Sequence, residues 1–182
     1  MYLFRTKFRN EIVSEFLPPI KPSNKVMIFC TGMPGYPNGM KILCEFFSKK
    51  GYWCFVPRYR GSWESGGKMF AKSPHEDIKD VIDELSKGFT EFYGKKKFII
   101  KNPEIYLIAS SFGGPAGLLL SNDPRVKKVI CFSPVLDWRD EKNNPAEPLS
   151  WLSKFVEQAF GNGYRIATVS YTHLTLPTIY SV

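Results

Sequence analysis

The residues with the clearest chemical potential are a serine and the small residues around it. Residues 105–114 read IYLIASSFGG, an apolar run that leads into a turn of small residues. In the pattern G-x-S-x-G, small residues on both sides of a serine allow a strained strand-to-helix turn that exposes the hydroxyl above a sheet. Ala109 and Gly113 stand at the two small positions, so Ser111, rather than Ser110, is the predicted nucleophile. A serine in an ordinary tight turn is the alternative.

A serine nucleophile needs a histidine base and an acid that orients it, in the chain order Ser, Asp or Glu, His. His75 precedes Ser111 and falls in the first turn of an expected helix, where the helix dipole disfavours the charged imidazole that a base must become. We expect it to be structural; the alternative is a place at the rim of the site. Asp137 is expected to be a loop residue and Glu64 a structural hydrogen-bond acceptor, and His173 is assigned no role.

The elements that must position this serine alternate between strand and helix along the chain. Apolar runs predict strands, and helical spacing predicts helices, as follows: strands at residues 25–30, 52–57, 105–109 and 126–132, and helices at 40–50, from 73 onward, at 112–121 and at 149–160. Strands that are apolar throughout and separated by helices indicate parallel strands covered on both faces. Residues 2–6 and 10–17 predict an antiparallel hairpin at the N-terminus. The expected fold class is therefore α/β, with a mostly parallel sheet flanked by helices.

The helix that begins at position 73 has the strongest start signal. Ser73 can cap it, Pro74 suits the first helical position, and Glu76 completes a capping box. The following apolar residues predict one buried face over about five turns: Ile78, Val81, Ile82, Leu85, Phe89 and Phe92.

Two further motifs, taken with the serine turn, carry a family resemblance. Residues 31–35 read TGMPG, similar to an H-G-x-P-G turn, and residues 60–66 read RGSWESG, similar to the loop R-G-x-G-x-S-x-G. With these motifs in this order, residues 25–166 resemble an α/β-hydrolase of the prolyl-oligopeptidase and serine-aminopeptidase type, an incomplete one. Thr31 stands where that family usually has His, and Trp63 where it usually has Gly.

The resemblance implies a serine hydrolase that cleaves a small-molecule ester or a peptide bond through an acyl-serine intermediate. It implies an oxyanion hole formed by the backbone N–H groups of Met33 and Phe112. In this family the acid follows a further strand and the histidine comes after it, beyond the strands that this chain is expected to contain. We therefore expect the chain to have little or no activity, because loss of triad members costs roughly four to six powers of ten in rate. The alternative function is a non-catalytic protein of the same fold that binds a small apolar ligand.

The C-terminal residues break the pattern of the rest of the chain. Residues 169–178 read VSYTHLTLPT, which is similar to one reading frame of a transposase-type sequencing adapter. We therefore interpret residues 1–168 as one partial α/β-hydrolase domain and residues 169–182 as a non-native tail. A genuine strand is the alternative, since Val, Tyr, Thr and Leu are common in strands.

Composition narrows the remaining classes of function. A chain of 182 residues that is 43% hydrophobic and carries 15 Phe can form one domain with a substantial core. Its formal charge of +8 would suit a nucleic-acid partner, but the one tight basic run, residues 95–97, is expected in a solvated loop, so no such partner is predicted.

The four cysteines lie far apart without a Cys-x-x-Cys pair and are expected to be small buried hydrophobic residues, so neither a metal nor a cofactor is predicted. Charges interrupt every apolar stretch in residues 1–16, which predicts no signal peptide or membrane span and a cytoplasmic location. Three of the four cysteines fall within the apolar strand runs.

Overall fold

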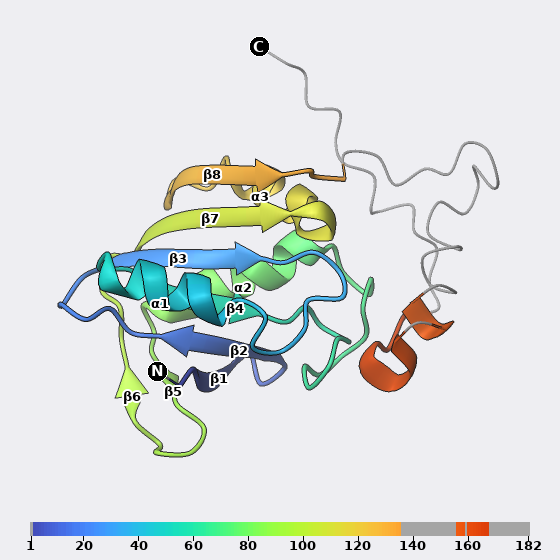
Figure 1. Ribbon diagram of the computed structural model, residues 1–182, viewed down its shortest axis with the longest axis horizontal. Coiled ribbons are helices and arrows are strands. Elements are labelled where there is room, and N and C mark those ends of the chain that lie inside the picture. The colour runs from blue at the N-terminus through green and yellow to red at the C-terminus, as the bar shows by residue number, and fades with distance from the viewer. Residues whose placement is uncertain (1, 136–155, 159, 168–182) are drawn as a thin grey trace, which may run out of the picture.

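The computed structural model describes residues 2–135, 156–158 and 160–167, which fold around one six-stranded sheet (Figure 1). The strands of this sheet are β1 (Phe4–Phe8), β2 (Ile12–Leu17), β3 (Lys25–Cys30), β4 (Trp53–Pro57), β7 (Glu104–Ser110) and β8 (Val126–Phe132). The helices are α1 (Lys41–Lys49), α2 (Pro74–Leu85) and α3 (Gly114–Leu120), with 3-10 turns η1 (Ser111–Gly113) and η2 (Gly161–Gly163). A separate two-stranded sheet joins β5 (Phe89–Thr90) to β6 (Lys97–Phe98).

The strand order is β1-β2-β4-β3-β7-β8, and it confirms the expected fold class. β3 pairs in parallel with both β4 and β7, and β7 pairs in parallel with β8. β1 and β2 form the expected antiparallel hairpin. Residues 9–11 join the two strands: Arg9 and Asn10 have left-handed φ angles of 49° and 55°, and the backbone N–H of Glu11 donates to the carbonyl of Phe8 at 2.9 Å.

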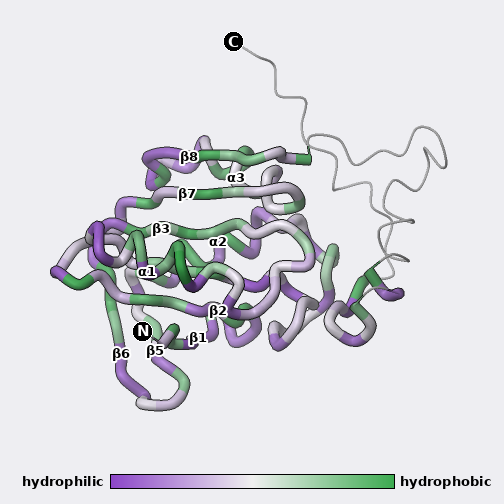
Figure 2. Tube along the Cα trace, viewed as in Figure 1, coloured by the Kyte–Doolittle hydropathy of each residue, from purple (hydrophilic) through white to green (hydrophobic). Residues whose placement is uncertain are grey.

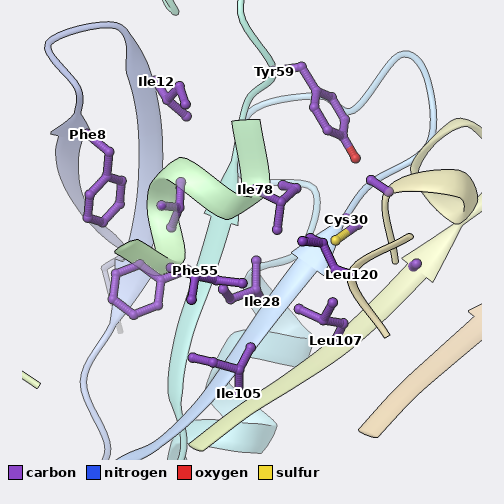
Figure 3. Close-up of a cluster of buried hydrophobic side chains, with 14 of the residues drawn as sticks. Phe8, Ile12, Ile28, Cys30, Phe55, Tyr59, Ile78, Ile105, Leu107 and Leu120 are labelled. Carbon is purple, nitrogen blue, oxygen red and sulfur yellow. The ribbon is translucent and has the colours of Figure 1, made fainter. Parts of the chain in front are cut away.

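The two faces of the sheet carry different helices. In Figure 1, α1 lies on the near face and α2 and α3 on the far face. The larger core lies under α2 and α3, and Figure 3 shows side chains from it, including Phe8, Phe55 and Ile78, packed between the sheet and α2. A smaller core under α1 contains Phe29 and Cys44. Burial of these apolar side chains on both faces explains why β3 and β4 read as continuous apolar runs.

The predicted five-turn face of α2 is too long. The capped start is correct: Pro74 follows the cap residue, and the backbone N–H of Ser73 donates to Glu76 at 3.3 Å. The helix ends at Leu85, however, and Gly88 has a φ of 106°, which turns the chain away from the helix axis. Phe89 therefore lies in β5, and Phe92 lies beyond it. The prediction that both belong to the helix is wrong, because their spacing continues its period across the break.

Several apolar side chains of α1 and β8 face outward. The helix α1 buries Cys44 and Ser48, whereas Phe46 is 53% exposed. β8 is the last strand of the sheet among the described residues, and its outer face exposes Ile130 and Phe132. Figure 2 shows the same strand as hydrophilic near its start and hydrophobic farther along. For α1, the apolar spacing predicts the helix correctly, but it does not predict which residues are buried, since Phe46 is exposed and Ser48 is buried.

A buried ion pair ties the hairpin to the loops that follow β3 and β4. The carboxylate of Glu15, 1% exposed, pairs with the guanidinium of Arg58, whose side chain is 3% exposed. Both oxygens of Glu15 also accept the backbone N–H of Asn38, at 3.1 and 3.2 Å. Arg58 in turn donates to Glu64 at 2.9 Å, so Glu64 is the hydrogen-bond acceptor that its loop position indicated.

Three cysteines lie in strands and one in α1; Cys30, Cys44 and Cys54 are buried as expected, whereas Cys131 is only partly buried because it lies in β8, the last described strand of the sheet. Within the described ranges, no helix has both the length and the apolar character that crossing a membrane requires.

The basic residues 95–97 are exposed, although Lys97 belongs to β6 rather than to a loop. The helical prediction for residues 149–160 falls mostly outside the described residues, but residues 156–158 are helical.

Candidate functional site

Ser111 lies at a sharp turn between β7 and α3, at the carboxyl edge of the sheet. Ser110 is still extended, with φ −141° and ψ 143°, and Ser111 has a φ of 46°. A non-glycine residue in this left-handed region costs about 1–2 kcal/mol, and such strain is concentrated at functional sites. The side chain of Ser111 is exposed rather than buried under the sheet. The turn predicted from the small residues at 109 and 113 is therefore present, and its hydroxyl is accessible.

Glycines make this turn sterically feasible. A Cβ on Gly113 would lie 2.1 Å from the carbonyl oxygen of Cys30, at the end of β3. A Cβ on Gly114 would lie 2.3 Å from the Cβ of Pro134, in the loop after β8. The carbonyl of Ser111 also accepts the N–H of Val135 at 3.1 Å. The turn is thus packed against the ends of the strands on both sides.

The departure from glycine at position 109 is compensated in α3. Gly117 faces Ala109, and a Cβ at Gly117 would lie 2.7 Å from the Cβ of Ala109 and 3.2 Å from Cγ1 of Val129. The methyl group that Ala109 adds to the motif occupies the space that Gly117 leaves empty. The strand accepts alanine because the helix above it has no side chain at that point.

This compensation predicts a coupled pair of variants. Gly117→Ala should lower the free energy of unfolding by about 1–3 kcal/mol, because two methyl groups would then compete for one space. Adding Ala109→Gly should recover part of that loss, with a coupling of about 1 kcal/mol, although glycine alone weakens a strand. Urea denaturation of both single variants and the double variant measures this. Strictly additive effects would contradict the compensation.

The loop after β3 lies against the serine turn. The backbone N–H of Gly32 donates to Oγ of Ser110 at 3.2 Å, and a Cβ on Gly32 would lie 3.1 Å from the Cβ of Ser111. Thr31, which replaces the usual His, is buried. The hydroxyl of Tyr59 donates to the Thr31 carbonyl at 3.5 Å, and in Figure 3 this ring lies over the end of β3 near Cys30.

The two expected oxyanion donors are the backbone N–H groups of Met33, which follows Gly32, and of Phe112, which follows Ser111. Among the described residues, no acceptor takes the backbone N–H of Met33, which is one residue beyond Gly32. Phe112 follows Ser111 in η1, and its buried ring packs 5.2 Å from Tyr59 and 5.8 Å from Phe70. Their roles as oxyanion donors stay predictions, as does the role of Ser111 as nucleophile.

Of the other candidates for catalysis, His75 and Glu64 lie in the described part of the chain. His75 Nδ1 lies 2.8 Å from Oγ of Ser73, and burial lowers the pKa of His75, which favours its neutral form. No described hydrogen bond joins it to Ser111. Asp137 and His173 lie outside the described residues. The expected non-native tail, residues 169–182, lies outside them as well.

Arg60, in the second loop motif, has a structural role that the sequence did not indicate. It binds the buried carboxylate of Asp77 in α2, donates to Asp80 at 2.8 Å, and contacts Glu11 of the hairpin at 2.5 Å. Burial acts to lower the pKa of Arg60, but its hydrogen bonds to these carboxylates outweigh burial and raise the pKa. This arginine therefore holds the loop of residues 60–66 to α2 and to the hairpin rather than facing a ligand.

The sheet is mostly parallel, and a left-handed serine joins a parallel strand to a helix at its carboxyl edge, so the chain has an α/β fold with a sharp strand-to-helix turn at Ser111. No protein-family model matches the chain, and neither does any curated protein. Comparison with solved structures identifies the particular architecture: the chain has an α/β-hydrolase fold.

Three of these structures show the kinds of protein that the chain resembles in fold. An α/β serine hydrolase homologue from Coxiella burnetii matches 71% of this chain and 61% of its own, at 18% identity and a TM-score of 0.52. An esterase from Exiguobacterium antarcticum matches 85% of this chain and 56% of its own, at 19% identity and a TM-score of 0.57. An epoxide hydrolase from Vigna radiata matches 88% of this chain and 46% of its own, at 17% identity and a TM-score of 0.54. The chain thus spans about half the length of the structures that it resembles.

Proposed function

We propose that this chain carries the nucleophile and the oxyanion donors of a serine hydrolase that cleaves a small-molecule ester or a peptide bond. The observation that carries the proposal is the exposed, left-handed Ser111 beside a loop whose Met33 N–H has no described acceptor. An esterase and a serine hydrolase homologue among the structural neighbours agree with this chemistry. A serine at the elbow favours acyl transfer, since its hydroxyl oxygen is the attacking atom in such reactions.

In the proposed reaction, the hydroxyl oxygen of Ser111 forms a bond to the acyl carbon, and the carbonyl electron pair moves onto the carbonyl oxygen. The backbone N–H groups of Met33 and Phe112 donate to that oxyanion, a contribution worth about 3–4 kcal/mol per donor in well-studied cases. The hydroxyl proton passes to a base and then to the leaving alcohol or amine, and water later cleaves the acyl-serine bond. Among the described side chains, no hydrogen bond to the Ser111 hydroxyl is present, so no described residue is assigned as this base.

A thiol at position 111 tests the turn without the help of a general base, because a thiolate is itself strongly nucleophilic. The Ser111→Cys variant should release one nitrophenolate per chain from p-nitrophenyl acetate. It should do so at least about tenfold faster than the Ser110→Cys variant, because the proposed oxyanion donors serve a nucleophile at position 111 and not at position 110. Stopped-flow absorbance gives the rate, and mass spectrometry locates the acetyl group.

The native cysteines give a low background in this experiment. Cys30 is buried, and burial raises its pKa to about 12. Burial also raises the pKa of Cys131, which is only partly covered. The unaltered chain supplies this background rate. Equal acylation of the Ser111→Cys and Ser110→Cys variants, with both folded by circular dichroism, would refute the proposal and favour a non-catalytic binding protein.

A further inference from the structure

The carbonyl of Pro34, next to the candidate oxyanion donor Met33, accepts hydrogen bonds from two aromatic side chains. The indole Nε1–H of Trp63 donates to it at 2.9 Å, and the hydroxyl of Tyr164 donates to it as well. The two donors come from segments about 100 residues apart, which pair through bridges between Ser62 and Tyr164 and between Met69 and Ile166. In Figure 1 the segment that contains Tyr164 lies beside the loop that follows β4.

Trp63 is itself held in place. Its backbone N–H donates to the carbonyl of Gly163 at 2.6 Å, and its carbonyl accepts from Arg165 at 3.0 Å. A Cβ on Gly163 would lie 2.9 Å from the indole ring, so the ring packs directly on the backbone there. The ring of Tyr36 packs 5.5 Å from Trp63, and Tyr164 lies 5.6 Å away on the same indole. Trp63 is therefore fixed at its backbone and on its ring.

The peptide that carries the Met33 N–H lies between two anchored points. On one side, the N–H of Gly32 donates to Ser110, and on the other side, the carbonyl of Pro34 accepts from Trp63 and Tyr164. A short stretch of backbone fixed at both ends has little freedom to rotate the amide between them. An oxyanion donor acts most strongly when it is oriented before the charge develops.

We propose that Trp63 and Tyr164 are positioning residues that orient the Met33 amide toward the carbonyl oxygen of the substrate. This inference deepens the proposed function and rests on it. Tryptophan stands where the resembling family usually has glycine, so this arrangement belongs to this chain rather than to the motif. Burial raises the pKa of Tyr164, so its hydroxyl keeps the proton that it donates at neutral pH.

Two reactions of the Ser111→Cys variant separate positioning from general packing. Acylation by p-nitrophenyl acetate develops an oxyanion, whereas alkylation by iodoacetamide occurs at a saturated carbon and develops none at the attacked centre. Trp63→Phe and Tyr164→Phe remove the donors but keep a ring in each place. With both changes added, the acylation rate should fall by about tenfold or more, whereas the alkylation rate should stay within about twofold. Each single change should have a smaller effect, because the second donor remains.

Tyr36→Phe is the matched control, since its ring belongs to the same aromatic cluster but its hydroxyl donates to no described group. It should leave both rates unchanged. A parallel fall of acylation and alkylation in the double variant, or no fall in acylation, would overturn the positioning role. Failure of the proposed function is a different result, because the Ser111→Cys variant with Trp63 and Tyr164 intact would then already be acylated no faster than the Ser110→Cys variant.

Discussion

Gly113→Ala is expected to lower the free energy of unfolding by more than about 4 kcal/mol, a loss in the range that only severe steric conflict produces. The added Cβ would lie 2.1 Å from the carbonyl oxygen of Cys30 and 2.7 Å from that of Thr31. Both contacts are with backbone in the centre of the structure, and β3 is hydrogen-bonded to strands on both sides. Neither the turn nor the strand can move without breaking ladder hydrogen bonds, so the conflict cannot be relieved by a change of rotamer.

Gly66→Ala provides the comparison for this variant. A Cβ there would lie 3.4 Å from Cγ of Glu11, which is ordinary contact with a side chain, and Gly66 does not have a left-handed φ. It should change the free energy of unfolding by less than about 1 kcal/mol. Guanidinium denaturation followed by tryptophan fluorescence measures both variants. Similar small losses in the two variants would mean that the elbow is less tightly packed against β3 than described.

Arg58→Met is expected to cost about 3–5 kcal/mol, because it leaves the carboxylate of Glu15 charged and buried without its partner. Glu15 is 1% exposed, and the remaining groups near it are the N–H of Asn38 and the guanidinium of Arg5 at 3.8 Å. Neither replaces a direct ion pair in the interior. The same change also removes the hydrogen bond to Glu64.

Adding Glu15→Gln to Arg58→Met tests the cause of that loss. The neutral amide removes the buried charge, so the double variant should be more stable than Arg58→Met alone. Lys79→Met serves as the control because it breaks an exposed pair with Asp83, at 3.2 Å, and should cost about 0.5 kcal/mol or less. Thermal denaturation at neutral pH ranks all three. A double variant less stable than Arg58→Met would show that packing, not charge, dominates at this place.

The elements near the serine could be predicted from the sequence because their signals are local. An apolar run followed by small residues was enough to predict β7, the turn at Ser111 and the helix after it. The hairpin was equally clear, since Arg9 and Asn10 separate two apolar stretches. The end of α2 was not predictable from spacing, because Phe89 continues the helical period even though Gly88 breaks the helix. The break depends on a single left-handed residue, which a count of apolar positions does not register.

The contacts that hold the site were not predictable, because their partners are distant in sequence. Arg58 and Glu15 are 43 residues apart, and Tyr164 and Pro34 are 130 apart. The identity of each residue was visible, but nothing local indicates that a tyrosine near one end of the chain meets a carbonyl near the other. The same limit applies to α1, whose exposed Phe46 fits a helical apolar pattern as well as a buried residue would.

The two donors to the carbonyl of Pro34 are made at different times during translation, because Tyr164 follows Trp63 by about 100 residues. The loop that contains Pro34 and the turn at Ser111 leave the ribosome before Tyr164 is made, since synthesis proceeds at about 5–20 residues per second from the N-terminus. Until Tyr164 has been made, Trp63 is the one of these two donors that can bind the carbonyl of Pro34. The backbone beside the serine thus gains its second anchor only after the described strands of the sheet have been made.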